Sequence, residues 1–434
     1  MAGPRSQDLA LEGFPDGVNN VFREDSVPTS QLRSAQNIDL LPDGKVRRRS
    51  GYLRRLGLSD GRSAASFQGR IILADGGDLL KIDPTDFSSE VLGSIPSNVR
   101  PDYTELNGAL YIAAEGAEGR KISLAGRYEA WAPEHPLGQP GLAAVAGLGS
   151  LPGGTYQIAV TFLRDGEESG AARAETIQLP PAGGAIQLSN IPQPSDPHTS
   201  AVRIYMTNTD GQILYQERDI PVQALGASVT IQSLPTGKQL ETQFMEPVPS
   251  GQAVSSYNGR LLSAVGEVLY YSQALRYGLC NIAQDYFQFA SRITMIQPVA
   301  HGVYVATEAT TYFLTGPTPE EFQLNTIADY GAIEGTNCLV PASAFPFQNM
   351  ETGNVAVWWS KSGGMVLGMA NGQIQYIRDG ELSIPDHARG VTMLREEDGV
   401  RQLLSVLQEP KSSMGGMAAK DEAVVTVYRN GIEI

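Results

Sequence analysis

The sequence predicts an all-β protein, and three observations support this prediction. Gly (47) and Pro (27) are abundant while charged residues make up only 18% of the 434 positions, a balance that favours short strands joined by turns over long surface helices. The apolar residues come in short runs that are rich in aromatic and β-branched members and end at Gly, Asn or Asp. One strand–turn–strand unit also recurs along the chain.

The recurring unit opens with a turn at a glycine, continues as an apolar strand, turns again and returns as a second strand. The turn glycines of successive copies are 39 residues apart from Gly69 to Gly108 and 43 apart from Gly259 to Gly302. These intervals match the roughly 40 to 50 residues of one four-stranded blade and predict a β-propeller of about six blades. The copies begin at Gln68, Asn107, Asn258 and His301, with two weaker ones at Gly363 and Asp398.

A segment of different character interrupts the repeat. Residues 138–247 contain two Asp-Gly turns between β-rich runs, and Pro/Gly-rich stretches flank them. Without these 110 residues, Gly108 and Gly259 would be 41 residues apart, which restores the period. The predicted parts are an extended N-terminal arm (1–48), a first propeller segment (49–137), an inserted immunoglobulin- or fibronectin III-like β-sandwich (138–247) and a second propeller segment (248–434).

The arm has little periodicity and is rich in Pro, Asp, Asn and Gly. Within it only residues 30–38 have helical character, with Ser30 as the N-cap. The alternation of residues 49–55 predicts the first propeller strand, with its arginines pairing carboxylates of the same or a neighbouring subunit.

The charge balance and the motifs argue against several function classes. A net charge of −15 disfavours general binding to nucleic acid or anionic membranes. We find neither a membrane-spanning run nor a signal peptide, and two cysteines, Cys280 and Cys338, suggest a reduced compartment. The four histidines lack paired-ligand spacing, and no phosphate-binding loop or nucleophile elbow occurs. We therefore expect a non-enzymatic protein with no catalytic residues, cofactor or metal.

The arm carries a family resemblance. Gly-Val-Asn-Asn at 17–20, Asn-Ile-Asp at 37–39, Gly-Lys-Val-Arg-Arg-Arg at 44–49 and Gly-Tyr at 51–52 are similar to the opening of the tail nozzle proteins, or tail tubular proteins B, of short-tailed bacteriophages. The resemblance is most specific over residues 13–55. It implies a propeller-based virion subunit, made in the host cytoplasm and assembled as a ring, six-fold in the nozzle family, that carries DNA out of the particle.

The resemblance also suggests partners. We expect the ring to contact portal-side adaptor proteins and fibre or needle proteins, and viral DNA to pass without specific binding because an acidic ring repels phosphate. The arm would dock on a neighbouring subunit or on the portal-side ring. The candidate interface residues are Val18, Asn19, Asn20, Leu32, Asn37, Asp39, Arg47, Arg48, Arg49 and Tyr52.

Two other functions stay open. The protein could be a tail-tip or baseplate-like adhesion component whose sandwich contacts the host surface. A propeller enzyme that degrades surface polysaccharide is the third class.

Overall fold

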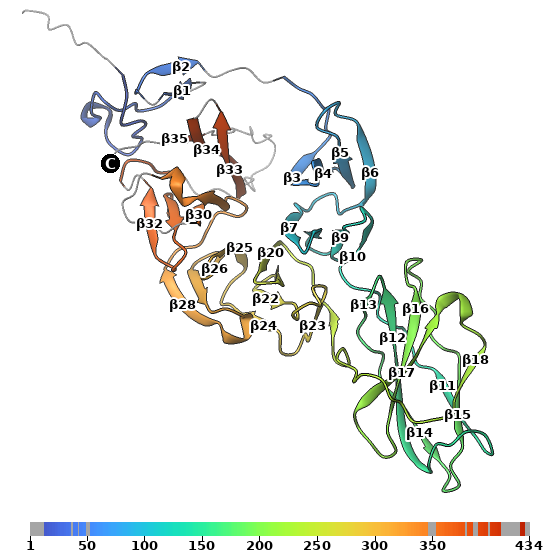
Figure 1. Ribbon diagram of the computed structural model, residues 1–434. Helices are drawn as coiled ribbons and strands as arrows, with labels where there is room; N and C mark the ends of the chain where they lie inside the picture. Colours follow the sequence, from blue (N-terminus) through green and yellow to red (C-terminus); the bar gives the residue numbers. More distant parts are fainter. Residues whose placement is uncertain are drawn as a thin grey trace, which may run out of the picture.

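The computed structural model describes residues 13–35, 38–41, 43–48, 53–345, 353–377, 380–384, 389–397, 400–408 and 426–429. The fold of these residues is all-β, as predicted. Six antiparallel sheets follow one another around a common centre to form a β-propeller, and a separate pair of sheets projects from one side of it (Figure 1). The only helices of the described residues are 3₁₀ turns: η1 (Glu24–Ser26), η2 (Val222–Ala224), η3 (Pro319–Glu321) and η4 (Ala342–Ala344).

Each blade is an up-and-down sheet whose strands pair in sequence order. The first two blades precede the sandwich. Blade 1 contains β3 (Gly61–Phe67), β4 (Arg70–Asp75), β5 (Asp78–Ile82) and β6 (Ser89–Ser94). Blade 2 contains β7 (Asp102–Leu106), β8 (Ala109–Ala113), β9 (Arg120–Ile122) and β10 (Tyr128–Ala130).

The other four blades follow the sandwich. Blade 3 contains β20 (Ala253–Tyr257), β21 (Arg260–Val265), β22 (Val268–Tyr271) and β24 (Tyr286–Gln288). Blade 4 contains β25 (Ile293–Val299), β26 (Gly302–Thr307), β27 (Thr311–Thr315) and β28 (Gln323–Ala328). Blade 5 contains β29 (Cys338–Pro341), β30 (Asn354–Trp359), β31 (Met365–Gly368) and β32 (Ile374–Ile377). Blade 6, as described, contains β33 (Arg389–Glu397), β34 (Val400–Gln408) and β35 (Thr426–Arg429).

The recurring sequence unit corresponds to the second and third strands of a blade. In blades 1, 2 and 3 the turn before the second strand is Gln68-Gly69, Asn107-Gly108 and Asn258-Gly259, and φ is positive at both residues of each pair. Two positive φ values define the type I′ turn, whose twist matches that of a β-hairpin. The copy from Gly363 differs, because it contains the third and fourth strands of blade 5.

Apolar clusters fill the junctions between successive blades. Phe67 and Ile72 of blade 1 pack with Leu110 of blade 2. Four further clusters join blade 2 to 3, 3 to 4, 4 to 5 and 5 to 6. The core of the propeller therefore lies between the sheets and not within any one of them.

The inserted segment forms a β-sandwich. Its sheets have the orders β11-β15-β18 and β14-β12-β16-β17, with β13 pairing the end of β12. A core that includes Tyr156, Phe162 and Ile204 lies between them. The strands are β11 (Gly141–Val145), β12 (Gly154–Arg164), β13 (Glu167–Glu168), β14 (Glu175–Leu179), β15 (Ala185–Ser189), β16 (Ala201–Thr207), β17 (Leu214–Pro221) and β18 (Ser228–Ile231).

The sandwich topology is immunoglobulin-like with two departures. If β11, β12, β14, β15, β16 and β17 are matched to strands B, C, C′, E, F and G, the B–E and C′–C–F–G pairings of that fold are reproduced. In the described residues strand A has no counterpart, and β18 pairs the free edge of β15. The chain returns to the propeller through β19 (Glu246–Pro247), which pairs β23 (Leu279–Cys280).

The arm contains one short hairpin, β1 (Ile38–Leu40) with β2 (Val46–Arg48). Two expectations about this region are wrong. Residues 30–35 form no helix, because the backbone of Leu32 pairs with that of Gly17 and Asn19. Residues 53–55 form no strand, and the first propeller strand begins at Gly61, while residues 49–52 lie outside the described residues.

Candidate assembly interfaces

The first group of predicted interface residues folds the arm onto itself. Val18 forms a parallel bridge with Leu32. The Asn19 side chain is fully buried: its Nδ2 donates to Gln31 Oε1 at 3.0 Å, and its Oδ1 accepts from the backbone N–H of Phe22 at 3.0 Å. These hydrogen bonds fix a compact loop in place of an extended segment.

Asn20 attaches this loop to the propeller of its own chain. Its Nδ2 donates to the Ser383 carbonyl at 2.7 Å, and its Oδ1 accepts from the Ser383 N–H at 2.9 Å. Gln31 Nε2 donates to Glu381 Oε1 at 2.9 Å. The contacted segment lies between blades 5 and 6, so the arm begins next to blade 6 and the chain then runs to blade 1 (Figure 1).

Asp39 and Arg47 face each other across the β1–β2 hairpin. They are register partners, and Arg47 Nη2 lies 3.9 Å from the buried Asp39 carboxylate. Arg48 is exposed in the same hairpin. Asn37, Arg49 and Tyr52 lie outside the described residues.

The exposed side chains of the arm differ in part from the residues that the sequence predicts at a subunit interface. Asn19 and Asp39 are buried, whereas Asn20, Arg47 and Arg48 are exposed, and the arm also exposes three apolar side chains, Val21, Phe22 and Val46. Exposed aromatic and aliphatic side chains beside arginine are typical of protein–protein contacts.

A buried charge cluster joins the sandwich to blade 2, and sequence reasoning missed it. Lys121 Nζ on β9 lies 2.7 Å from Glu167 Oε1 of the sandwich and 3.8 Å from Glu129 Oε1 on β10. Arg164, at the end of β12, donates to the Ala130 carbonyl at 2.8 Å. Arg164, Lys121 and Glu129 are only 1%, 3% and 6% exposed.

The cluster continues at its edges. Arg164 Nη1 lies 3.2 Å from Asp196, and Arg127 of blade 2 pairs with Asp165 of the sandwich. The ammonium of Lys121 also lies 5.8 Å from the centre of the Tyr111 ring. Burial is the main cause that raises the pKa of Tyr111 above its usual range. One signal was present in the sequence, since Arg164 directly follows the apolar run at 158–163, but the sequence does not show which distant residues pair with it.

The blade 3 segment that pairs with the return strand β19 adds a second attachment. Gly278 lies against the backbone of Trp131, where a Cβ would come within 2.4 Å of the Trp131 carbonyl oxygen. Cys280 is buried beside Trp131 in the cluster between blades 2 and 3. Burial raises the pKa of the Cys280 thiol to about 12. The two linkers and the charge cluster together define how the sandwich sits on the propeller.

Charged side chains also link separate blades. They lie on the face of the propeller that carries the loops leading into the first strand of each blade. Arg292 of blade 4 forms a two-bonded pair with Glu115 of blade 2, at 2.7 and 3.0 Å. The hydrogen bonds from Arg292 lower the pKa of Glu115. Asp102 is buried nearby and accepts from the Val254 N–H at 2.8 Å, while desolvation raises the pKa of its carboxyl group.

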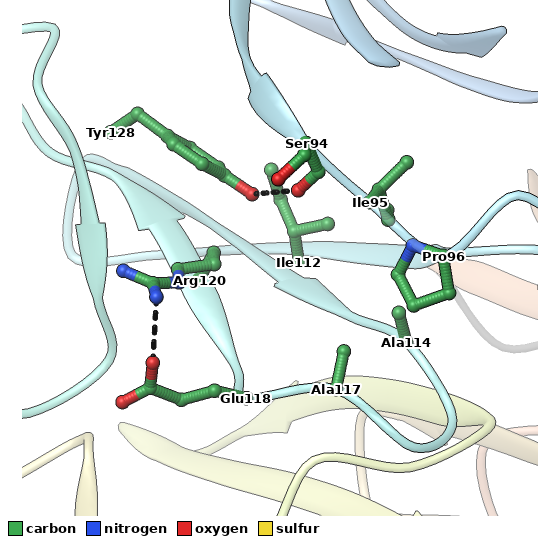
Figure 2. Close-up of a pocket in the computed structure, with 9 residues that line it drawn as sticks. All are labelled: Ser94, Ile95, Pro96, Ile112, Ala114, Ala117, Glu118, Arg120 and Tyr128. Carbon is green, nitrogen blue, oxygen red and sulfur yellow. Dashed lines mark hydrogen bonds and ion pairs between the residues drawn. The ribbon is translucent and has the colours of Figure 1, made fainter. Parts of the chain in front are cut away.

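A cavity of about 360 Å³ lies between blades 1 and 2 (Figure 2). Its wall is mainly apolar, with Ile95, Ile112 and the Tyr128 ring, and the Arg120–Glu118 ion pair at 2.7 Å adds charge. The lining contains no histidine or cysteine, so the nucleophile–base pairs in which those residues take part are not formed there.

No group of three or more His, Cys, Asp or Glu side chains in the described part of the chain is arranged to hold a metal ion. Both cysteines are free. Among the same residues, no helix has the length and apolar character that crossing a membrane requires.

No family model and no curated protein matches the chain. Among solved structures, it is similar to a quinoprotein alcohol dehydrogenase-like protein from Bacteroides thetaiotaomicron, with 12% identity over 87% of this chain and 65% of that one and a TM-score of 0.34. The Dos1 propeller shares 11% identity over 85% and 79% of the two chains, with a TM-score of 0.32. The Neurospora crassa Pan2 WD40 domain shares 6% over 79% and 85%, also with 0.32.

Proposed function

We propose that this protein is a structural subunit of a bacteriophage tail, one copy of a ring-shaped nozzle through which DNA is ejected. The observation that carries the proposal is the N-terminal run over residues 13–55, which resembles the opening of the tail nozzle family. A β-propeller with an inserted sandwich is compatible with that role but is shared by many other functions.

Charge supports the conduit. A subunit of net charge −15, repeated six-fold, gives a ring of roughly −90 charges that does not hold a polyanion, because few phosphates would find cationic partners. The DNA passes without specific binding. Portal-side and fibre- or needle-side tail proteins are the other expected partners.

The arm supplies a means of assembly. Because its polar side chains are satisfied inside its own chain, Phe22, Val46 and Arg48 remain available for a neighbouring subunit or for the portal-side ring. Replacing Phe22 by Ser and Val46 by Ser should leave the propeller folded while reducing the number of copies incorporated into particles. Normal copy number in particles made with this variant would contradict docking through the arm.

Immunogold electron microscopy tests the location. Antibody raised against residues 138–247 is applied to intact phage particles and to denatured particles as a control. The proposal predicts gold at the tail, near the capsid junction. If neither intact nor denatured particles bind the antibody, the protein is not a virion component and the proposal fails.

A second candidate is an adhesion component of the tail tip. It is favoured by the sandwich, which projects away from the ring of blades (Figure 1). Deleting residues 138–247 separates the two functions, and it leaves Lys121 and Glu129 as a mutual pair at 3.8 Å. Particles carrying a nozzle subunit with this deletion should assemble and bind host cells, whereas particles carrying a shortened adhesin should assemble and lose adsorption.

A further inference from the structure

The end of the sandwich that lies farthest from the propeller is formed by three loops (Figure 1). Strand β12 ends at Arg164 beside blade 2, so its first residue, Gly154, lies at the opposite end, together with the last residues of β14 and β16. The loops at this end are 146–153, 180–184 and 208–213. We call these three loops the distal tip.

The distal tip is almost without charge. Across its three loops the only charged side chain is Asp210, although 18% of the whole chain is charged. The Asp210 carboxylate is paired within the sandwich, because its Oδ1 accepts from the Thr155 N–H at 2.8 Å. A surface of this kind attracts neither cationic nor anionic groups, so its charge matches a neutral partner.

The exposed surface of the distal tip is largely apolar. Ile213 and Leu148 are 48% and 42% exposed. The other exposed apolar residues of the loops are small or cyclic: Ala146, Pro152, Pro180, Pro181 and Ala182. Two aliphatic side chains therefore project from a surface that has few groups to desolvate.

Hydrogen bonds between the loops hold the distal tip in one shape. Leu151 and Gly184 exchange both backbone hydrogen bonds, each at 3.0 Å, which joins the first loop to the second. Tyr156 Oη lies 2.9 Å from the Pro152 carbonyl and 2.8 Å from Thr209 Oγ1, which joins the first loop to the third. Backbone groups that are already paired can enter an apolar medium at lower cost, and a rigid tip loses little conformational entropy on binding.

The composition of the tip distinguishes between kinds of neutral partner. Protein interfaces are centred on aromatic and arginine side chains, and the three loops contain neither. Aromatic rings that could stack on the faces of sugars are missing for the same reason. Aliphatic side chains that are free of neighbouring charges partition favourably into lipid, so the tip fits a bilayer better than it fits a protein or a glycan.

We propose that the distal tip docks on the surface of a zwitterionic lipid bilayer by inserting Leu148 and Ile213 among the headgroups. The sandwich holds these side chains away from the propeller, so the contact needs no positive charge (Figure 1). The contact is peripheral and shallow, because only loop residues enter the lipid. It is a property of the single chain and holds whether or not the protein is part of a phage tail.

A tryptophan reporter tests insertion of the tip. Leu148→Trp places an indole in the first loop, while Trp131, Trp358 and Trp359 are at most 2% exposed and stay away from lipid. The full-length variant is titrated with phosphatidylcholine vesicles, with or without bromine on the acyl chains. We expect brominated lipid to quench the added tryptophan with half-saturation at about 1 to 10 mM lipid, roughly ten- to a hundredfold weaker than a single myristoyl chain.

Charge variants locate the contact. In the Leu148→Trp background, Ile213→Glu should weaken half-saturation at least about tenfold, because a carboxylate enters lipid unfavourably. Leu324→Glu, at a 52% exposed position on the outer strand of blade 4, is the matched control and should leave it unchanged. Flotation of the unmodified chain with phosphatidylcholine vesicles, and its loss in Leu148→Glu, shows that the natural leucine is sufficient.

Four results would overturn the proposal. Absence of both flotation and quenching up to about 10 mM lipid would mean that the tip does not enter a bilayer. Equal flotation of Leu148→Glu would mean that another surface binds lipid. Flotation only with vesicles that contain anionic phosphatidylglycerol would mean that cationic groups elsewhere make the contact. Self-association of the unmodified chain without lipid, abolished by Leu148→Glu, would mean that the tip contacts a second copy.

Discussion

Two joints of this molecule use opposite chemistry. The sandwich is joined to blade 2 by a buried cluster of charges around Arg164, whereas blades 1 and 2 are joined by an apolar cluster that includes Phe67, Ile72 and Leu110. Buried ion pairs with defined geometry cost desolvation energy but tolerate few alternative arrangements, while apolar contact is favourable in many arrangements. The comparison indicates that the polar joint fixes an orientation through specific partners, whereas the apolar joints hold the blades together through burial.

The largest expected effect is at the polar joint. Arg164→Met removes the guanidinium that lies near Glu129, Glu167 and Asp196, so the buried Glu129 and the largely buried Asp196 lose part of their compensating charge. The free energy of unfolding should fall by about 3 to 5 kcal/mol in urea titrations followed by tryptophan fluorescence. Lys81→Met, at the exposed Lys81–Glu90 pair, should change it by about 1 kcal/mol or less. Equal losses of unfolding free energy in the two variants would contradict the role of the charge cluster in fixing the sandwich on blade 2.

The blade 3 segment that pairs with the return strand β19 should give the next largest effect. Gly278→Ala adds a Cβ within 2.4 Å of the Trp131 carbonyl oxygen, and the backbone on both sides must move. We expect a loss of about 1 to 3 kcal/mol in the same titration. Gly226→Ala, in a sandwich loop where the nearest atom is 3.9 Å from the added Cβ, is the control and should be close to neutral. If Gly278→Ala leaves the free energy of unfolding unchanged, the segment around Gly278 has room to shift away from Trp131.

A third change tests the junction between blades 5 and 6. Trp359 Nε1 donates to Ser405 Oγ at 2.9 Å, from blade 5 to blade 6. Trp359→Phe should cost about 1 kcal/mol more than Trp358→Phe, because Trp358 is equally buried but its Nε1 makes no hydrogen bond among the described residues. Thermal unfolding of the two variants measures the difference. If it is zero, this bond does not help to hold blade 6.

The smallest expected effect is a dependence on pH. Arg292 lowers the pKa of Glu115, so their pair contributes stability above the ordinary carboxyl pKa, and the contribution is lost as pH falls through the lower folded value. The stability difference between the unmodified protein and Glu115→Gln should therefore shrink below about pH 4. If the stability difference stays constant down to pH 2, the Glu115–Arg292 pair does not contribute the predicted pH-dependent stability.

The sequence predicted the structure well where the backbone conformation depends on neighbouring residues. The Asn107-Gly108 and Asn258-Gly259 turns have positive φ at both residues, and this chemistry is readable from two letters. The repeat pattern groups the Gly363 copy with the others, although it forms the third and fourth strands of its blade, because all apolar hairpins of a blade have similar sequence patterns. The helix predicted over residues 30–38 does not form where it is described, because a contact of Leu32 with residues 17–19 overrides its weak propensity.

The candidate sites depend on contacts that the sequence does not display. Asn19 and Asn20 were selected for a neighbouring subunit, and both make hydrogen bonds inside their own chain. The sequence does not identify Arg164 and Lys121 as residues of an interface, because each has a partner in the other domain. The prediction that the arm serves subunit contact stays a prediction, now with Phe22 and Val46 as the exposed side chains.

Electron cryomicroscopy of tails from phage particles that contain this protein tests the central claim most directly. The account predicts a ring of propellers around the DNA path, with blade 2 and the sandwich fitting the density as one rigid body in the same orientation in every copy. A tail without such a ring would contradict the proposed function. A sharp propeller ring with sandwich density that averages away would contradict the fixed orientation assigned to the charge cluster.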